Sequence, residues 1–156
     1  MKMIDVGAKP RTVRVAVARG FVAMSAATVG IVRRGGSEKG DVLAAARLAG
    51  IMAAKRTPDL VPLCHPIALS GVDVLAEPRA GGVEITATVR TVDRTGVEME
   101  ALAAVSAAAL TVYDMLKRYE RGMRIEAVEL IEKAGGRSGH WRRAPARSRP
   151  RGARGR

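Results

Sequence analysis

The feature that most constrains the fold is an apolar helical pattern in the second half of the chain. From Glu98 to Tyr119, apolar side chains recur close to every 3.6 residues, at Met99, Leu102, Val105, Ala109, Val112 and Leu116. This pattern predicts a long helix that is buried along much of its length. Because aromatic residues make up only 3% of the chain, small aliphatic side chains must fill the core, and we expect helices to pack closely through them.

Strand-like segments lie on both sides of this helix. Alternating valines from residue 13, continued by apolar residues 21–24, predict one long strand or a hairpin. Residues 72–77 and 83–92 predict a hairpin around a turn at 78–82, and residues 123–131 predict another strand. An Ala-rich helix is expected over residues 39–56, after Gly35-Gly36 and the candidate cap Ser37.

The order of these elements predicts the fold class. Strand, helix, two strands, helix and strand indicate an α+β sandwich, with helices packed on one face of a mainly antiparallel sheet. Between the first helix and the hairpin, Pro62 and Pro66 bracket residues 63–65, so we expect an extended segment over 59–66 that presents His65 from a fixed loop. The interpretation is one catalytic domain over 1–140 and an Arg-rich, disordered tail over 141–156.

The formal net charge of +12 is concentrated at the C-terminus. Eight of the 27 Lys and Arg residues lie between 137 and 156, where there is no Asp or Glu, so the first 136 residues carry 19 basic against 15 acidic side chains. This balance suits a small anionic substrate better than a DNA duplex. A nucleic-acid-binding protein that uses the tail remains the alternative, and it predicts strongly salt-dependent binding that is lost when the chain is cut after His140.

The cysteine content and the N-terminus bear on the compartment. The single cysteine, Cys64, can form no intrachain disulfide and cannot hold an iron–sulfur cluster alone, which is typical of a reducing compartment. Residues 1–5 lack the apolar stretch of a secretory signal, and the longest apolar run, 101–113, is shorter than the roughly 18 residues of a membrane span. We therefore expect a cytoplasmic protein with no membrane association.

Two charged residues on the long helix are the first candidates for chemistry. Asp114 and Lys117 are three positions apart and share a face, where they form either a surface ion pair or part of a site. Because Asp114 follows a long apolar run, desolvation there can tune its pKa for proton transfer. Lys39, before Gly40-Asp41, opens the earlier helix, where it can hold a phosphate, or where Asp41 simply caps the helix.

Other candidates lie in loops and at element ends. Glu98 and Glu100 begin the long helix and can either cap it or contact substrate. Cys64-His65 suggests a metal site or a nucleophile, but His140 is the only other histidine, so zinc is improbable and His65 fits better as a hydrogen-bond donor. Lys133 and the glycine loop 135–139 can surround a phosphate or form a flexible exit, although the loop lacks the P-loop motif.

Several longer motifs occur in a distinctive order. They are Lys39-Gly40-Asp41-Val42, Ala53-Ala54-Lys55-Arg56-Thr57, Leu60-Val61-Pro62-Leu63-Cys64-His65-Pro66, Thr95-Gly96-Val97-Glu98-Met99-Glu100-Ala101-Leu102 and Leu110-Thr111-Val112-Tyr113-Asp114-Met115. With them, the chain from about residue 4 to Gly139 resembles the MoaC family of cyclic pyranopterin monophosphate synthases. The resemblance implies conversion of 3′,8-cyclo-7,8-dihydro-GTP, made by a separate radical enzyme, to cyclic pyranopterin monophosphate and diphosphate.

The resemblance also implies an assembly. It suggests a ferredoxin-like fold and a homohexamer arranged as a trimer of dimers, with active sites at subunit interfaces. No bound cofactor is implied, and whether Mg²⁺ accompanies the substrate triphosphate is left open. Weak binding of polyanions by the tail is compatible with this function.

Site residues follow from the same resemblance. It makes Asp114 the principal acid/base residue, with Lys117 as its partner and Lys39 as a further cation. The residues expected to contact substrate are Leu63, Cys64, His65, Glu98, Met99, Glu100, Arg14 and Lys133, of which Arg14 and Lys133 match triphosphate contacts. One departure is Arg137, which stands where the family pattern has Lys and which binds phosphate with a different geometry.

Overall fold

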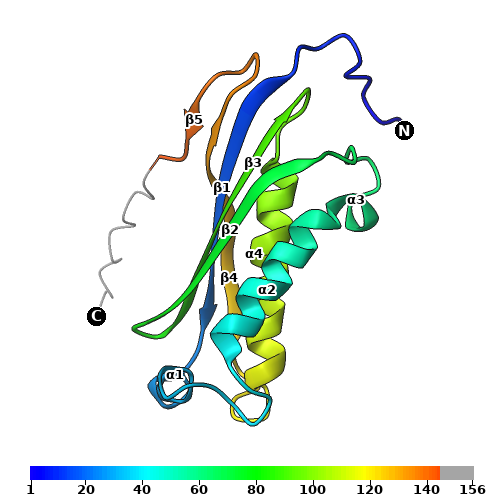
Figure 1. The fold of residues 1–156 in the computed structure, drawn as a ribbon. Coiled ribbons are helices and arrows are strands. Elements are labelled where there is room, and N and C mark those ends of the chain that lie inside the picture. Colours follow the sequence, from blue (N-terminus) through cyan, green and yellow to red (C-terminus); the bar gives the residue numbers. More distant parts are fainter. Residues whose placement is uncertain (145–156) are drawn as a thin grey trace, which may run out of the picture.

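One antiparallel sheet organises the computed structural model, which describes residues 1–144 (Figure 1). Across the sheet the strands follow the order β2-β3-β1-β4-β5. Their bounds are β1 (Thr12–Ala23), β2 (Leu69–Arg79), β3 (Gly82–Asp93), β4 (Arg124–Ala134) and β5 (Trp141–Arg142). The helices are α1 (Ala26–Arg33), α2 (Val42–Lys55), α3 (Thr57–Leu60) and α4 (Glu98–Leu116).

The two long helices cover one face of this sheet, as Figure 1 shows. Helix α4 packs on β1, β3 and β4, while α2 packs on β2 and alongside α4. The path β1-α2-β2-β3-α4-β4 through the strand order β2-β3-β1-β4 is the ferredoxin-like arrangement. The predicted α+β class is therefore confirmed.

Small side chains allow α4 to lie close to its neighbours. Ala101, Ala104 and Ala108 are fully buried on α4, against alanines and valines of β1 and β3. A Cβ atom on Gly20 of β1 would lie 2.6 Å from a methyl carbon of Val105, which is closer than real contacts allow. The close packing expected from the low aromatic content thus depends on glycine at a defined position.

Helix α4 also resembles a membrane span in composition. It is long and apolar enough to cross a membrane by length and hydropathy, and it is the only such helix among the residues that the structure describes. Half of the apolar 18-residue stretch of this helix is buried inside the protein. The core helix of a soluble protein can have the same length and hydropathy, and α4 packs on the middle strands of the sheet as such a helix does.

Most of the predicted elements are present, with shifted ends. The first segment is one strand and the hairpin alternative is wrong, whereas the β2–β3 hairpin is confirmed with a tighter turn at Ala80-Gly81. Helix α4 ends three residues earlier than predicted, and Met99 is 40% exposed instead of buried. Helix α2 is capped by Asp41, not by Ser37, because the Asp41 carboxylate accepts hydrogen bonds from two backbone amides of its first turn.

Two short helices were not predicted. Helix α1 contains β-branched residues and glycine, but Ser25 caps it and Glu120 accepts hydrogen bonds from the Ser25 amide and the Thr28 hydroxyl, which are distant in sequence. Helix α3 occupies part of the segment predicted to be extended, because Pro58 is compatible with the first turn of a helix. Tertiary contacts and a proline position therefore outweigh local propensity in this region.

The first two residues of the predicted tail form a strand. Trp141 and Arg142 pair with β4 as the edge strand β5, and the Arg143 side chain donates to the Leu130 carbonyl at 2.7 Å. The ordered part of the chain thus extends past His140. The rest of the predicted tail, residues 145–156, lies outside the described residues.

Candidate active site

A carboxylate between two lysines lies at the C-terminal end of α4. The Asp114 side chain accepts from Lys117 Nζ at Oδ1, 2.7 Å, and from Lys39 Nζ at Oδ2, 2.6 Å. Lys117 follows on the same helix, whereas Lys39 comes from the loop before α2, 75 positions away. The structure thus brings together the three residues that the sequence indicated as catalytic, which we call the lysine cluster.

The environment of the lysine cluster is wet and ionic. Each of the three side chains is about half exposed, between 52% and 55%. Hydrogen bonds from Lys117 and Lys39 lower the pKa of Asp114 from 3.8 to about 2. The prediction that desolvation tunes the pKa of Asp114 is therefore wrong, because hydrogen bonds from the two lysines dominate and Asp114 points away from the buried face of α4. Asp114 is therefore an anion that holds the two lysine side chains in place.

The other end of α4 carries a buried carboxyl. Glu100 is only 2% exposed, and its Oε1 accepts a hydrogen bond from Cys64 Sγ at 3.4 Å. The other oxygen, Oε2, is buried without a hydrogen-bond partner among the described residues. Burial raises the pKa of Glu100 above its ordinary value of 4.5. This carboxyl is suited to holding a proton.

The thiol next to Glu100 is held in its protonated form. Burial, followed by the charge and hydrogen bonding of Glu100, raises the pKa of Cys64 to about 11. A thiol with that pKa is a poor nucleophile at neutral pH. Around this pair, which we call the glutamate–thiol pair, His65 and Glu98 are half-buried, while Leu63 and Met99 are exposed apolar side chains. Five of the residues expected to contact substrate therefore lie near the start of α4 or in the loop after α3, whose Cys64 contacts Glu100.

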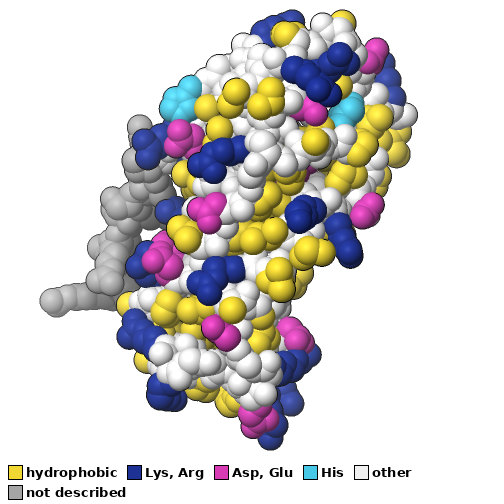
Figure 2. All heavy atoms as spheres, in the orientation of Figure 1, with side chains coloured by type: hydrophobic (Ala, Val, Ile, Leu, Met, Phe, Trp, Pro, Cys, Tyr) yellow, Lys and Arg dark blue, Asp and Glu magenta, His cyan; other side chains and the backbone are white. Residues whose placement is uncertain are grey.

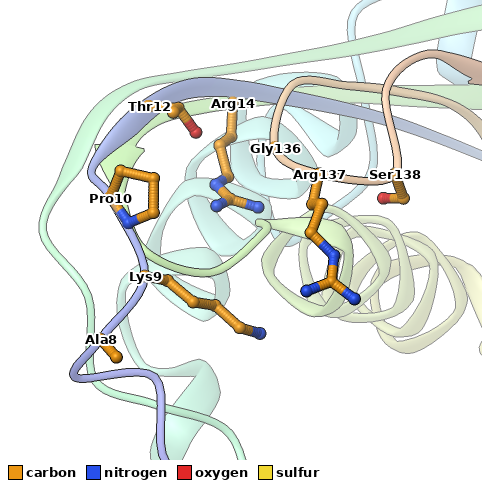
Figure 3. Close-up of a pocket in the computed structure, with 8 residues that line it drawn as sticks. All are labelled: Ala8, Lys9, Pro10, Thr12, Arg14, Gly136, Arg137 and Ser138. Carbon is orange, nitrogen blue, oxygen red and sulfur yellow. The ribbon is translucent and has the colours of Figure 1, made fainter.

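A basic cavity lies at the start of β1 (Figure 3). It has a volume of about 750 Å³, and no Asp or Glu is among its lining residues, which are Ala8, Lys9, Pro10, Thr12, Arg14, Gly136, Arg137 and Ser138. Figure 3 shows the side chains of Lys9, Arg14 and Arg137 converging on the same space. Three cations around one cavity favour an anionic ligand.

Backbone contacts fix Arg14 in this basic cavity. Its guanidinium donates to the carbonyl oxygens of Asp93 and Arg94, each at 3.0 Å. Gly136 lies on the other side with φ +72°, and a Cβ atom there would lie 2.2 Å from an Arg14 nitrogen. The glycine loop is therefore shaped around Arg14. Lys133 lies nearby and hydrogen-bonds Ser138, but its side chain does not line the cavity.

Of the cations in the cavity, Lys9 was not predicted to belong to a site, and Arg137 was considered only as part of the glycine loop. Because β1 and β4 are antiparallel neighbours, the segment before β1 meets the loop after β4. A sequence reading could have found Lys9 only by first deducing that strand pairing. The position of Arg137 within the glycine loop was an indication in the sequence that it lies at an anion site.

The three groups occupy two ends of the molecule. The Arg14 guanidinium bonds to the segment that leads into α4, so the basic cavity and the glutamate–thiol pair lie toward the same end. Glu100 and Asp114 are 14 residues apart on α4, so at 1.5 Å per residue the helix separates the glutamate–thiol pair from the lysine cluster by roughly 21 Å. One copy of the chain therefore does not bring all the predicted site residues together.

Metal binding has little support from side-chain positions. Within residues 1–144, no group of three or more His, Cys, Asp and Glu side chains is arranged to hold a metal ion. The side chains gathered in the basic cavity and around Asp114 are mainly Lys and Arg. The fold and these groups define an α+β protein of ferredoxin-like topology with basic residues for an anionic ligand at both ends of its central helix.

Comparison with known proteins identifies the family. The chain belongs to the MoaC family, whose model matches residues 3–136. It is 62% identical over 144 residues to a protein of Thermomicrobium roseum, a match that covers 91% of this chain and 87% of that protein. It is 57% identical over 143 residues to one of Novosphingobium aromaticivorans, covering 92% and 91%. Both relatives bear the name cyclic pyranopterin monophosphate synthase.

Proposed function

We propose that this chain converts 3′,8-cyclo-7,8-dihydro-GTP to cyclic pyranopterin monophosphate and diphosphate, a lyase reaction of molybdenum cofactor biosynthesis. Membership of the MoaC family supports this function. The structural observation that carries it is the lysine cluster, in which one carboxylate orients two ammonium groups from distant parts of the chain. A reaction that rebuilds a ring system needs such oriented proton carriers.

The chemistry divides between the groups described above. Opening the imidazole ring and closing the pterin ring require several proton transfers, for which Lys117 and Lys39 supply ammonium protons while Asp114 holds them. The buried Glu100 carboxyl is a second group that can hold a proton. Formation of the cyclic phosphate expels diphosphate, whose charge the basic cavity can neutralise through Arg14, Lys9 and Arg137.

The reaction as written balances without a redox partner, so we expect no resident cofactor. Mg²⁺ is expected, if at all, with the triphosphate of the substrate. The substrate would come from a separate radical enzyme. We place the reaction in the cytoplasm.

We further propose that each active site is shared between two copies of the chain. A two-fold axis that sets two α4 helices antiparallel would bring the lysine cluster of one copy beside the glutamate–thiol pair of the other. Such pairing overcomes the roughly 21 Å that separate Asp114 from Glu100 along α4 within one chain. The arrangement agrees with the homohexamer, a trimer of dimers, that the family resemblance implies.

Exposed apolar side chains on the helix layer support contact between copies. Leu48 and Leu110 are each 62% exposed, and Met52 is 39% exposed. Figure 2 shows hydrophobic side chains among Lys and Arg over the face that carries α2 and β2. Burial of such side chains against a second copy would stabilise an assembly.

Direct assay tests the reaction. Purified protein is incubated with the cyclised GTP derivative, and the pterin product and diphosphate are both measured. Equal amounts of the two products are expected. Release of diphosphate without a pterin product, or no conversion by a folded protein, would contradict the proposal.

Mixing two inactive variants tests the shared site. Asp114→Asn disables the lysine cluster and His65→Ala disables the opposite end. If each site takes one group from each copy, random reassociation restores roughly a quarter of wild-type activity, because half of the dimers contain one intact site. If both groups act within one copy, the mixture stays inactive.

A further inference from the structure

Lys39 is carried by a tight turn. The amide of Ser37 donates to the carbonyl of Gly40 at 3.0 Å, and the amide of Gly40 donates back at 2.9 Å, so Glu38 and Lys39 form the tip. Gly40 has φ +107°, which favours glycine. The Lys39 amide also donates to the Ser37 hydroxyl at 3.2 Å. The backbone of Lys39 is therefore closely constrained within the turn.

Residues just beyond α4 hold this turn from outside. The amide of Glu38 donates to the phenol oxygen of Tyr119 at 3.1 Å. The Glu38 carboxylate pairs with Arg118. Together with Asp114, these residues give the segment from Asp114 to Tyr119 three contacts with the tip of the turn. A cavity of about 120 Å³ adjoins them, lined by Glu38, Lys39, Asp114, Met115, Lys117, Arg118 and Tyr119.

The ion pair alone is a weak way to fix Lys39. Both side chains are about half exposed, and exposed pairs contribute little to stability because water screens them and the flexible lysine loses entropy. The hydrogen bond to Tyr119 acts instead on the backbone next to Lys39, where it limits motion of the turn itself. The position of the ammonium then depends on Tyr119.

We propose that Tyr119 is a positioning residue, which holds the turn 37–40 so that the Lys39 ammonium stays on Asp114. The expected effect on turnover rests on the proposed function. The expected effect on Asp114 does not, since it follows from the contacts of the folded protein alone. Glu38, Arg118 and Lys117 are the other charged groups around Asp114.

The test compares two tyrosine-to-phenylalanine variants. Tyr119→Phe removes the acceptor oxygen and keeps the ring. Tyr113→Phe is the matched control, because the Tyr113 hydroxyl donates to the Arg121 carbonyl at 2.9 Å and does not touch the turn. The carboxyl carbon of Asp114 is titrated by NMR in wild type, in both variants and in Lys39→Gln, which shows the full effect of losing the lysine.

The expected results separate the two proposals. In Tyr119→Phe the pKa of Asp114 rises part of the way from about 2 toward the Lys39→Gln value, and kcat falls roughly five- to tenfold with little change in KM. Tyr113→Phe leaves both unchanged. An unaltered pKa in Tyr119→Phe would overturn the positioning role. A raised pKa in a protein that never converts the cyclised nucleotide would support the positioning role and reject the proposed function.

Discussion

The two ends of α4 place carboxyl groups in opposite environments. Asp114 is half exposed between two lysines, and its pKa is lowered to about 2. Glu100 is buried beside a thiol, and its pKa is raised. The same functional group is thus easier to ionise than in water at one end and harder to ionise at the other, and environment alone makes the difference. If two copies bring these ends together, the assembled site contains both.

Replacing Lys117 is the most direct test of the exposed end of α4. Lys117→Ala removes a proton carrier and one hydrogen bond to Asp114, so turnover should fall by roughly 10²–10⁴-fold while the pKa of Asp114 rises. Steady-state kinetics and the NMR titration measure the two effects. Arg33→Gln, which removes an exposed cation from α1, is the control for loss of charge. Equal, small losses in both variants would mean that Lys117 contributes only net charge.

Glu100→Gln tests the opposite end without changing side-chain size. An amide cannot hold the proton, so turnover should fall by roughly 10²-fold. The pKa of Cys64 should also fall from about 11, but only partly, because burial is its largest cause and remains. The pH dependence of thiol alkylation measures this shift. Glu98→Gln is the control for that titration, and an equal fall there would show that Glu100 does not govern the thiol.

The basic cavity is probed by a pair of glycine variants. Gly136→Ala places a methyl group on the Arg14 guanidinium and should raise KM roughly tenfold by displacing it. Gly139→Ala imposes a similar backbone strain at φ +63°, but its Cβ meets nothing within 4 Å. The difference in KM between the two variants therefore separates the effect of the clash with Arg14 from the effect of backbone strain. Matching KM values would show that Arg14 does not hold the triphosphate.

The pH dependence of stability should differ in sign between the ends. The pKa of Glu100 is raised on folding, so its contribution to stability is complete below 4.5 and is lost as pH rises through the folded pKa. The pKa of Asp114 is lowered, so its contribution is present above 3.8 and is lost as pH falls toward 2. Thermal unfolding from pH 3 to 8 should show that Glu100→Gln removes the fall in stability that the wild type undergoes as pH rises above 4.5. Asp114→Asn should lower stability at neutral pH and remove the loss of stability that the wild type shows as pH falls below 3.8.

Much of this arrangement could be predicted from local pattern. Helical spacing alone put Asp114 and Lys117 on one face, and the alternating residues of β3 indicated its buried side. The state of Asp114 was misjudged because an apolar run in sequence does not show which way each residue points. Residues 112, 115 and 116 are buried, whereas Asp114 between them is exposed. Counting the helical repeat through Val112 and Leu116 would have corrected this.

The remaining features of the site depend on contacts between segments that are distant in sequence, which residue spacing does not encode. Lys9 reaches the basic cavity only because β1 lies next to β4, and Glu100 meets Cys64 only because the loop after α3 lies at the start of α4. The separation of the two ends follows from the length of α4 and from its straight path across the sheet. A list of motif residues cannot show that separation, so the need for a second copy emerges only from the fold.

Removal of the Arg-rich tail is expected to have the smallest effect on kcat and KM. It tests whether the triphosphate contacts are confined to the basic cavity. The described chain leaves the sheet beside the glycine loop, since Trp141 pairs with Lys133, and a truncation tests whether the tail arginines add to the cavity cations. If Lys9, Arg14 and Arg137 suffice for the triphosphate, truncation after Ala144 keeps β5 and changes kcat and KM by less than about twofold. The same truncation should abolish any salt-dependent binding to RNA or DNA, measured by fluorescence anisotropy. A large rise in KM would instead assign part of the triphosphate contact to the tail, and the basic end would then extend beyond the cavity.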